Sequence, residues 1–159
     1  MDNKEIWKPI KGYEDCYEVS NLGNIRSLTR LVYYSNGHYQ TKKGQNIKPQ
    51  KTIHGYYQVE LHKDRQKQKK MLHTVVAEAF IPNPNNYKEI NHKDHNKTNN
   101  CVYNLEWCTR EENILDMVLY NKKIGKYGNR KKYLCPICGE KRDNKAKVCR
   151  KCYLIQIKK

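Results

Sequence analysis

Short alternations of hydrophobic and polar residues run through the first seventy positions of the chain. Residues 17–20 alternate, residues 21–24 hold the Asn and Gly of a turn, and residues 25–28 resume as a second strand. Residues 56–61 repeat the alternating pattern. The pattern predicts a β-rich segment over residues 5–70.

The period changes after residue 71. Hydrophobic side chains then recur at helical spacing, which predicts a short helix over residues 72–80. Pro82 and Pro84 place a loop after this helix. Strands are predicted over residues 87–92 and 105–108, with a long Asn-rich loop between them.

A second helix is predicted directly after the last of these strands. Thr109 is a residue type that caps helices, and Glu112 follows three residues later, which is the pattern of a capping box. Apolar residues at 114, 115, 118 and 119 continue the helix. Together with the β-rich start, these elements predict an α+β protein.

Charged residues are unevenly distributed along the chain. The 159 residues include 32 Lys and Arg against 16 Asp and Glu, a net charge of +16. Residues 122–159 hold fourteen of the basic residues and only Glu140 and Asp143 as acids. This shift predicts a boundary near Asn121 and three modules, which span residues 5–70, 71–121 and 122–159.

The basic surface favours a polyanionic partner, and nucleic acid is the leading one. A membrane surface would need an amphipathic basic helix with an aromatic face, and the sequence has none. The N-terminus lacks the basic and apolar regions of a signal peptide, and no apolar run approaches a membrane span. We therefore expect no membrane partner, and no obligate protein partner is evident.

A basic stretch at residues 63–70 follows the strand at 56–61 and suits the tip of a hairpin. Two interpretations stay open for it. It is either a solvated turn that keeps a sheet edge soluble or a contact to phosphates.

The stretch from residue 90 to residue 113 carries candidate chemistry. His92 ends the first strand beside the Asn-rich loop, and Asn113 lies one turn into the second helix. If the strands pair and the helix packs across them, these side chains converge. Histidine suits a general base near neutral pH, and amide oxygens such as those of Asn91 and Asn113 suit a hard divalent cation.

These residues resemble the HNH nucleases of phage and intron-encoded homing endonucleases. The stretches that carry the resemblance are LHTVVAEAFIPNP at 72–84, NHKDHNKTNN at 91–100 and NLEWCT at 104–109. The resemblance implies a ββα-metal core, double-stranded DNA as substrate, and Mg2+ or Mn2+ as cofactor. It casts His92 as general base, and Asn113 and Asn91 as metal ligands. Asn104 becomes the middle Asn, which orients the loop and holds His92 by a hydrogen bond.

Two positions depart from the family pattern. Many members have Asp where this chain has Asn91, and a neutral amide is a weaker ligand than a carboxylate. Gly is common where His95 stands, and we interpret His95 as a loop residue in preference to an added ligand. An alternative for the whole stretch is a loop of self-bonded Asn and Asp residues without chemistry.

The N-terminal part resembles a second known unit. The stretches WKPIKGYE at 7–14, YEVSNLGNIRSL at 17–28 and GYYQV at 55–59 look like the small DNA-binding module of NUMOD type that precedes such nuclease domains. The two resemblances in this order are more specific than either alone, and they cover roughly residues 7–120.

Two CxxC pairs lie in the basic tail, and four thiolates suit a tetrahedral zinc ion. A redox role would need a thioredoxin-like βαβ context, which is absent. We expect a structural Zn2+ site with a closed ligand shell. The four expected ligands are Cys135, Cys138, Cys149 and Cys152. Cys16, Cys101 and Cys108 are interpreted as core or loop residues.

The sequence thus predicts a β-rich DNA-binding module, an HNH nuclease core and a small zinc-binding module. The expected activity is metal-dependent cleavage of DNA in the cytoplasm, that of a bacterial host if the chain is phage-encoded. A DNA-binding regulator with a weak or inactive site is the alternative, and an RNA-associated zinc protein is a second one. The residues expected to contact DNA are Arg26, Arg30, Lys69, Lys70, Lys93, Lys97, Arg110, Arg142, Lys145, Lys147, Arg150 and Lys151.

Overall fold

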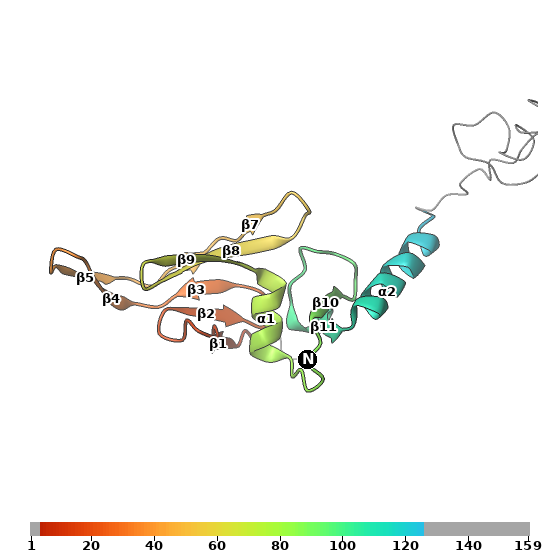
Figure 1. The fold of residues 1–159 in the computed structure, drawn as a ribbon, viewed down its shortest axis with the longest axis horizontal. Coiled ribbons are helices and arrows are strands. Elements are labelled where there is room, and N and C mark those ends of the chain that lie inside the picture. Colours follow the sequence, from red (N-terminus) through yellow and green to blue (C-terminus); the bar gives the residue numbers. More distant parts are fainter. Residues whose placement is uncertain (1–3, 126–159) are drawn as a thin grey trace, which may run out of the picture. The chain divides into compact units, whose positions relative to one another are not determined.

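The computed structural model describes residues 4–125, and within this range it is a strand-rich α+β structure with two α-helices (Figure 1). The α+β prediction is therefore confirmed for this part of the chain. The residues up to Leu115 belong to one unit and those from Asp116 onward to another, and each is described by itself. The predicted division into modules at residues 70 and 121 stays a prediction.

A four-stranded sheet opens the chain, with the strand order β1-β2-β3-β6. Its members are β1 (Trp7–Pro9), β2 (Tyr17–Ser20), β3 (Ile25–Ser27) and β6 (Asn46–Ile47). All neighbouring strands in it are antiparallel. Its central hairpin, β2 and β3 with the turn between them, matches the predicted strand-turn-strand pattern.

The second sheet has the antiparallel order β7-β8-β9. It consists of β7 (Gln50–Lys51), β8 (Tyr57–Lys63) and β9 (Gln66–Met71). The hairpin turns at Asp64 and Arg65, both with positive φ. The basic stretch at 63–70 therefore contains the tip of this hairpin, as predicted, and its residues from Gln66 onward lie in β9.

A separate hairpin pairs β4 (Arg30–Tyr33) with β5 (Tyr39–Lys42). Every residue of β5 is exposed. The alternation of hydrophobic and polar residues is weak here, which is why the sequence did not predict this hairpin. One face carries Tyr33 and Tyr39, whose rings lie 6.1 Å apart between centroids.

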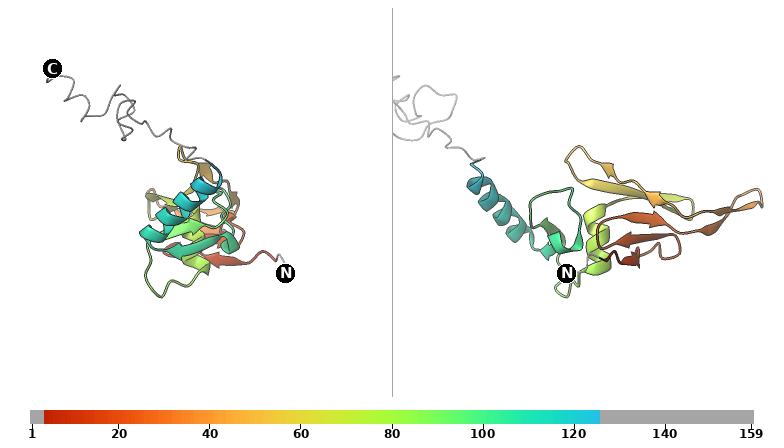
Figure 2. Two further views of the ribbon diagram at one scale, coloured as in Figure 1. Left: turned by 90° about the vertical axis from the view of Figure 1, so that its right-hand side faces the viewer. Right: turned by 180° about the vertical axis from the view of Figure 1, so that it is seen from behind.

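Helix α1 (Leu72–Phe80) has the bounds that the sequence predicts. It stands between β1–β3 and β8–β9 on one side and a final hairpin on the other (Figures 1 and 2). That hairpin pairs β10 (Glu89–His92) with β11 (Leu105–Cys108), and η1 (Val102–Asn104) leads into its second strand.

One hydrophobic core joins these elements through helix α1. Leu72, Val75 and Val76 of the helix are at most 2% exposed, and Leu105 of β11 packs into the same cluster. Burial of each such side chain contributes about 1.5–3 kcal/mol. The remaining members come from the two sheets and the turn before β2, and they are Ile10, Tyr17, Val19, Ile25, Val59 and Leu61.

Helix α2 (Arg110–Lys123) closes the described part, and none of its residues is buried. Its first turn holds Glu111 and Glu112 and its last turn holds Lys122 and Lys123, which matches the polarity of the helix dipole. Within residues 4–125 no helix is long and apolar enough to cross a membrane.

Candidate active site

The β10–β11 hairpin is the scaffold of the candidate site. In its antiparallel register Asn91 faces Glu106, and Glu89 faces Cys108. Side chains two residues apart on a strand share a face, so Glu89 and Asn91 lie on one face together with their partners on β11. The predicted pairing of these two strands is confirmed.

His92 ends β10 and is buried, with 6% of its surface exposed. Its Nε2 lies 3.2 Å from the Oδ1 of Asn100, whose own Nδ2 donates to the carbonyl of Thr98. This second bond fixes the orientation of the amide, so Nε2 of His92 must be the donor. A neutral His92 therefore carries its lone pair on Nδ1.

Two aromatic rings pack against the His92 ring. The rings of His73 and His92 meet edge to face at 5.2 Å between centroids, and Tyr56 lies 6.0 Å away. Burial lowers the pKa of His92, an effect that Lys97 adds to and that Asn100 and Asp94 oppose. The neutral form, which a general base requires, is therefore favoured at neutral pH.

His73 is held in its neutral form even more strongly. Burial lowers the pKa of His73 to about 4, and the neighbouring His92 adds to the effect. Its Nδ1 is a buried side-chain atom without a hydrogen-bond partner within the described structure. The ring thus acts as an apolar wall beside His92.

Asn104 organises the loop between the two strands. Its amide nitrogen donates to Asp94 Oδ1 and to the Asn99 carbonyl, both at 2.8 Å, and its Oδ1 accepts the N–H of Asp94. Although burial works against the charge, bonds from Asn99, the Asn96 N–H and Asn104 lower the pKa of Asp94. Asn104 therefore joins both ends of the loop through these bonds, and its catalytic role stays a prediction.

The prediction that Asn104 also bonds to His92 is wrong. The bond to the ring comes from Asn100, because Asn104 directs its amide toward Asp94 and Asn99. The loop is bonded to the backbone of His92, because His95 donates its N–H to the His92 carbonyl at 2.7 Å. His95 has a φ of 58°, in keeping with its interpretation as a loop residue.

Each proposed amide ligand donates to a carboxylate. Asn91 Nδ2 lies 3.1 Å from Glu106 Oε1, and Asn113 Nδ2 lies 3.2 Å from Glu89 Oε2. Asn113 is thereby tied to the first residue of β10, whereas His92 is the last. Within the described residues no hydrogen bond joins His92 to Asn113, so convergence on one point stays a prediction.

The side-chain oxygens around this hairpin face suit a hard divalent ion, which prefers carboxylate and amide oxygens as ligands. The residues present are Asn91 and Asn113, with Glu89 and Glu106 beside them. Over residues 4–125 no group of three or more His, Cys, Asp or Glu side chains is arranged to hold a metal. A site here would therefore depend on its amide oxygens, as the predicted ligand set does.

Electrostatics show that this face is acidic although the chain as a whole is basic. The pKa of Cys108 is raised to about 11, first by burial and then by the carboxylates of Glu106, Glu112 and Glu89. Cys108 is therefore a thiol at neutral pH, in line with its interpretation as a core residue.

The capping box that positions Asn113 is confirmed. Glu112 Oε2 accepts the N–H of Thr109 at 2.8 Å, and Thr109 Oγ1 accepts the N–H of Glu112 at 3.2 Å. The Asn113 N–H bonds to the Thr109 carbonyl at 3.1 Å. The cap thus sets the first turn of α2 against the hairpin.

The residues expected to contact DNA have different surroundings. Arg26 donates to Glu18 and stacks on Trp7, and Arg30 donates to the carbonyls of Cys16 and Leu28. These two arginines are occupied in holding the N-terminal sheet. The expectation that they contact DNA stays a prediction.

The expected lysines are more accessible. Lys69 is exposed on β9, while Lys70 lies 3.9 Å from Glu78. Lys93 is exposed beside Glu106, and Lys97 stacks on Tyr56 with its Nζ 4.3 Å from the ring centroid.

Arg110 is exposed at the start of α2. The expected zinc ligands and the basic residues around them lie outside the described residues. They are Cys135, Cys138, Cys149 and Cys152, with Arg142, Lys145, Lys147, Arg150 and Lys151.

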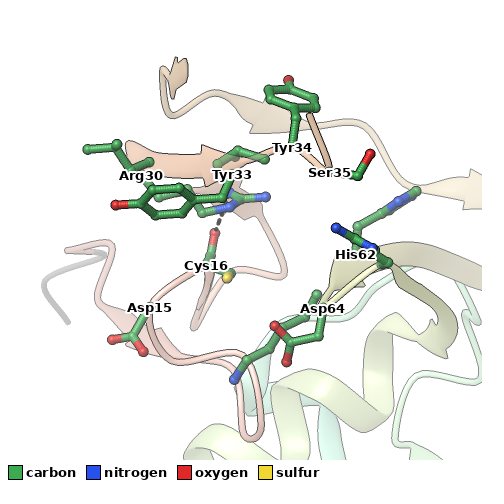
Figure 3. A pocket seen from close by; sticks show the side chains of 12 residues that line it. Asp15, Cys16, Arg30, Tyr33, Tyr34, Ser35, His62 and Asp64 are labelled. Carbon is green, nitrogen blue, oxygen red and sulfur yellow. Dashed lines mark hydrogen bonds between the residues drawn. The ribbon is translucent and has the colours of Figure 1, made fainter. Parts of the chain in front are cut away.

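A hollow in the N-terminal region shares none of the predicted site residues except Arg30 (Figure 3). Side chains of β4 and of the β8–β9 hairpin line it, and Asp15 and Cys16 close one side. In this hollow Arg30 donates to the Cys16 carbonyl at 3.4 Å. It belongs to the packing between two hairpins and is separate from the residues around His92.

Four neighbours of the site were missed from the sequence: Glu89, Glu106, Asn100 and His73. The strand register would have located Glu106, because the pairing of residues 89–92 with 105–108 places it opposite Asn91. No local signal identifies His73, since its contact with His92 depends on the packing of α1.

Two family models match the chain in succession. Residues 5–62 match the NUMOD4 motif, and residues 70–115 match an HNH endonuclease family. The order and positions agree with the two resemblances seen in the sequence.

Known proteins give the same result. The DNA endonuclease I-HmuI of Bacillus phage SP01 is 34% identical over 108 residues, which cover 68% of this chain and 55% of I-HmuI. An uncharacterized HNH endonuclease of Acanthamoeba polyphaga mimivirus, L245, is 33% identical over 128 residues, or 77% of this chain and 38% of that protein. The chain thus spans only part of the length of these relatives.

A solved structure supports the fold. The structure that describes DNA binding and cleavage by the HNH homing endonuclease I-HmuI matches with a TM-score of 0.59 and 29% sequence identity. The match covers 76% of this chain and 66% of that one.

Proposed function

Because this chain carries an HNH endonuclease domain behind a NUMOD4 motif and is homologous to I-HmuI, we propose that it is a metal-dependent endonuclease that hydrolyses phosphodiester bonds in double-stranded DNA. The observation that carries the proposal is His92. It lies at the end of β10 inside the matched HNH segment, is held by Asn100 through Nε2, and directly follows the candidate metal ligand Asn91 in the chain.

His92 acts as the general base in this proposal. The bond from Nε2 to Asn100 leaves Nδ1 as the basic nitrogen, and the lowered pKa of the ring keeps that nitrogen unprotonated at neutral pH. Nδ1 accepts a proton from the attacking water. The walls formed by Tyr56 and His73 hold the ring in place.

HNH nucleases generally use a divalent metal ion, and we assign Mg2+ or Mn2+ to this chain, held by Asn91 and Asn113. When bound, such an ion would neutralise charge that develops on the phosphate and on the leaving oxygen. Asn104 keeps the loop that follows His92 in one conformation through Asp94 and Asn99.

Phosphate contacts by exposed lysines supply affinity that is independent of sequence. Lys93 and Lys97 lie in the loop between β10 and β11, and Lys69 is exposed on β9. We assign this role to these three lysines together with Arg110. The zinc module of the basic tail adds further contacts, with Zn2+ held by its four cysteines. By likeness to a phage homing endonuclease, the enzyme acts on a specific site within the cytoplasm of a host cell.

The test is incubation of supercoiled plasmid with the full chain and Mg2+ or Mn2+, followed by gel analysis. Wild type should produce nicked or linear DNA, and His92→Ala should not, while both bind DNA equally in a gel-shift assay. Equal cleavage by both proteins would contradict the assignment of His92.

One observation favours a second candidate, a DNA-binding regulator with a weak site. Asn91 provides a neutral amide where a carboxylate binds a divalent ion more strongly. For this candidate, wild type shifts DNA in the gel but leaves it intact with every metal supplied, and Asn91→Asp gains cleavage.

A further inference from the structure

The two candidate metal ligands, Asn91 and Asn113, share a feature that the proposed role of His92 does not require. Each is an amide, and each donates its nitrogen to a glutamate carboxylate. Asn91 bonds across the strand pair to Glu106, and Asn113 bonds from α2 to Glu89 at the start of β10. One pair joins β10 to β11 and the other joins α2 to β10, so the same arrangement occurs twice at this hairpin.

An ionised carboxylate only accepts hydrogen bonds. The end of the amide that meets it must therefore be the NH2 group, whichever way the side chain would otherwise turn. The carbonyl oxygen of the same amide is then directed away from that carboxylate. A hydrogen bond to a charged acceptor is also stronger than one between neutral groups, so the orientation is held firmly.

We propose that Glu106 and Glu89 are positioning residues, which turn the carbonyl oxygens of Asn91 and Asn113 toward the divalent ion. The proposal rests on the proposed function, because it assumes that these amides bind the metal. Groups that bond to metal ligands fix the orientation of those ligands and increase their basicity. A carboxylate behind each neutral amide supplies both effects.

The pairs also supply negative charge to a site whose ligands have none. Glu89 and Glu106 lie on the face of the hairpin that carries Asn91, because residues 89 and 91 share one side of β10 and Glu106 pairs with Asn91. Lys93 lies 4.0 Å from Glu106, so this charge is partly balanced. The cation is attracted to the face without a carboxylate at position 91.

The first experiment measures Mn2+ binding to the full chain without DNA, by calorimetry and by the Mn2+ EPR signal. Loss of binding in Asn91→Ala/Asn113→Ala identifies the site. Glu106→Ala and Glu89→Ala remove the acceptor and should each weaken binding about 10-fold or more. Glu106→Gln and Glu89→Gln keep an acceptor oxygen but lose the charge, so each should weaken binding less than the corresponding Ala replacement does.

Glu111→Ala is the matched control. Glu111 is an exposed acid in the same first turn of α2, and its removal changes the net charge by the same amount. Its Mn2+ affinity should equal that of wild type. If Gln and Ala replacements weaken binding equally, or if no replacement of Glu89 or Glu106 has an effect, the positioning role is overturned.

A second pair of variants changes little in size, so that folding is not at issue. Asn91→Asp alone places two carboxylates against each other, at positions 91 and 106. In Asn91→Asp/Glu106→Gln the new Gln amide can donate a hydrogen bond to the new Asp carboxylate. Positioning predicts that the double variant binds Mn2+ more tightly than Asn91→Asp. If Glu106 were itself a ligand, the double variant would bind more weakly, and if Glu106 had no role, the two would be equal.

Different results would contradict the proposed function and the positioning role of the glutamates. A wild-type protein that neither binds Mn2+ at this site nor cuts DNA contradicts the proposed function. A wild-type protein that does both, with the order of Asn91→Asp and the double variant reversed or absent, contradicts the positioning role alone.

Discussion

The N-terminal strands and the hairpin that follows α1 are built in different ways. The segment at residues 5–62 is held by apolar side chains such as Val19, Ile25 and Val59, which are at most 2% exposed. The hairpin contributes Leu105 to that core, but its long loop is held by bonds among Asn and Asp side chains. The first region tolerates change wherever volume and pattern are kept, and the second depends on individual atoms.

Of the changes that test this comparison, the largest effect is expected in the polar loop. Asn104→Ala removes two donated bonds and one accepted bond, which frees the loop that follows His92. Displacement of a catalytic group by about 1 Å costs roughly 100-fold in rate. We expect single-turnover cleavage to fall by about that factor. Tyr103→Ala is the control, because Tyr103 is 65% exposed beside it, and an equal loss there would contradict the role of the loop.

The next effect concerns pH. Unfolded His73 has an ordinary pKa of 6.5, and burial lowers that of the folded protein to about 4. Between these values the unfolded chain binds a proton that the folded chain does not, so stability is present above pH 6.5 and is lost as the pH falls toward 4. The loss should be on the order of 3 kcal/mol.

His73→Phe removes this titration and the unpartnered Nδ1. Urea unfolding at pH 7 and pH 4 should show a smaller loss of free energy for the variant than for wild type. The same loss in both proteins would mean that His73 does not titrate in this range.

The third effect lies at the junction between the hairpin and α2. Thr109→Ala removes the oxygen that accepts the Glu112 N–H, and loss of such a cap costs about 1 kcal/mol. Urea denaturation should show this decrease, while Thr109→Ser should retain most of the stability. If Ala and Ser were equivalent, the cap would not contribute.

The smallest effect is expected on the basic surface. Lys69→Gln removes one exposed charge from β9, so DNA affinity should fall a few-fold and the dependence of log affinity on log salt should become shallower by about one unit. Fluorescence anisotropy at several salt concentrations measures both. Gln68→Ala, its uncharged neighbour, should leave the slope unchanged, and an unchanged slope for Lys69→Gln would exclude a phosphate contact.

Prediction from the sequence succeeded where a period or a local motif decides the structure. The helix at residues 72–80 and the cap at Thr109 depend on spacing alone, and both are confirmed. The hairpin of β4 and β5 was missed, because its strands are largely exposed and lack a clear alternation.

The site was predicted less completely than the fold. The resemblance pointed to Asn104 as the partner of His92, but the loop presents Asn100 instead, a choice that depends on how the chain turns between residues 93 and 104. Glu89 acquires its bond to Asn113 only when α2 meets the hairpin. Such contacts are set by packing and leave no trace in residue spacing.

The central claim is that His92 is the base of a metal-dependent DNA nuclease. The most direct measurement is the single-turnover cleavage rate at saturating DNA and Mn2+, compared between wild type and His92→Ala at neutral pH. A general base contributes about 10²–10⁴-fold, so the rate of the variant should fall by that factor while its DNA affinity is unchanged. A variant that cuts at the wild-type rate would contradict the claim.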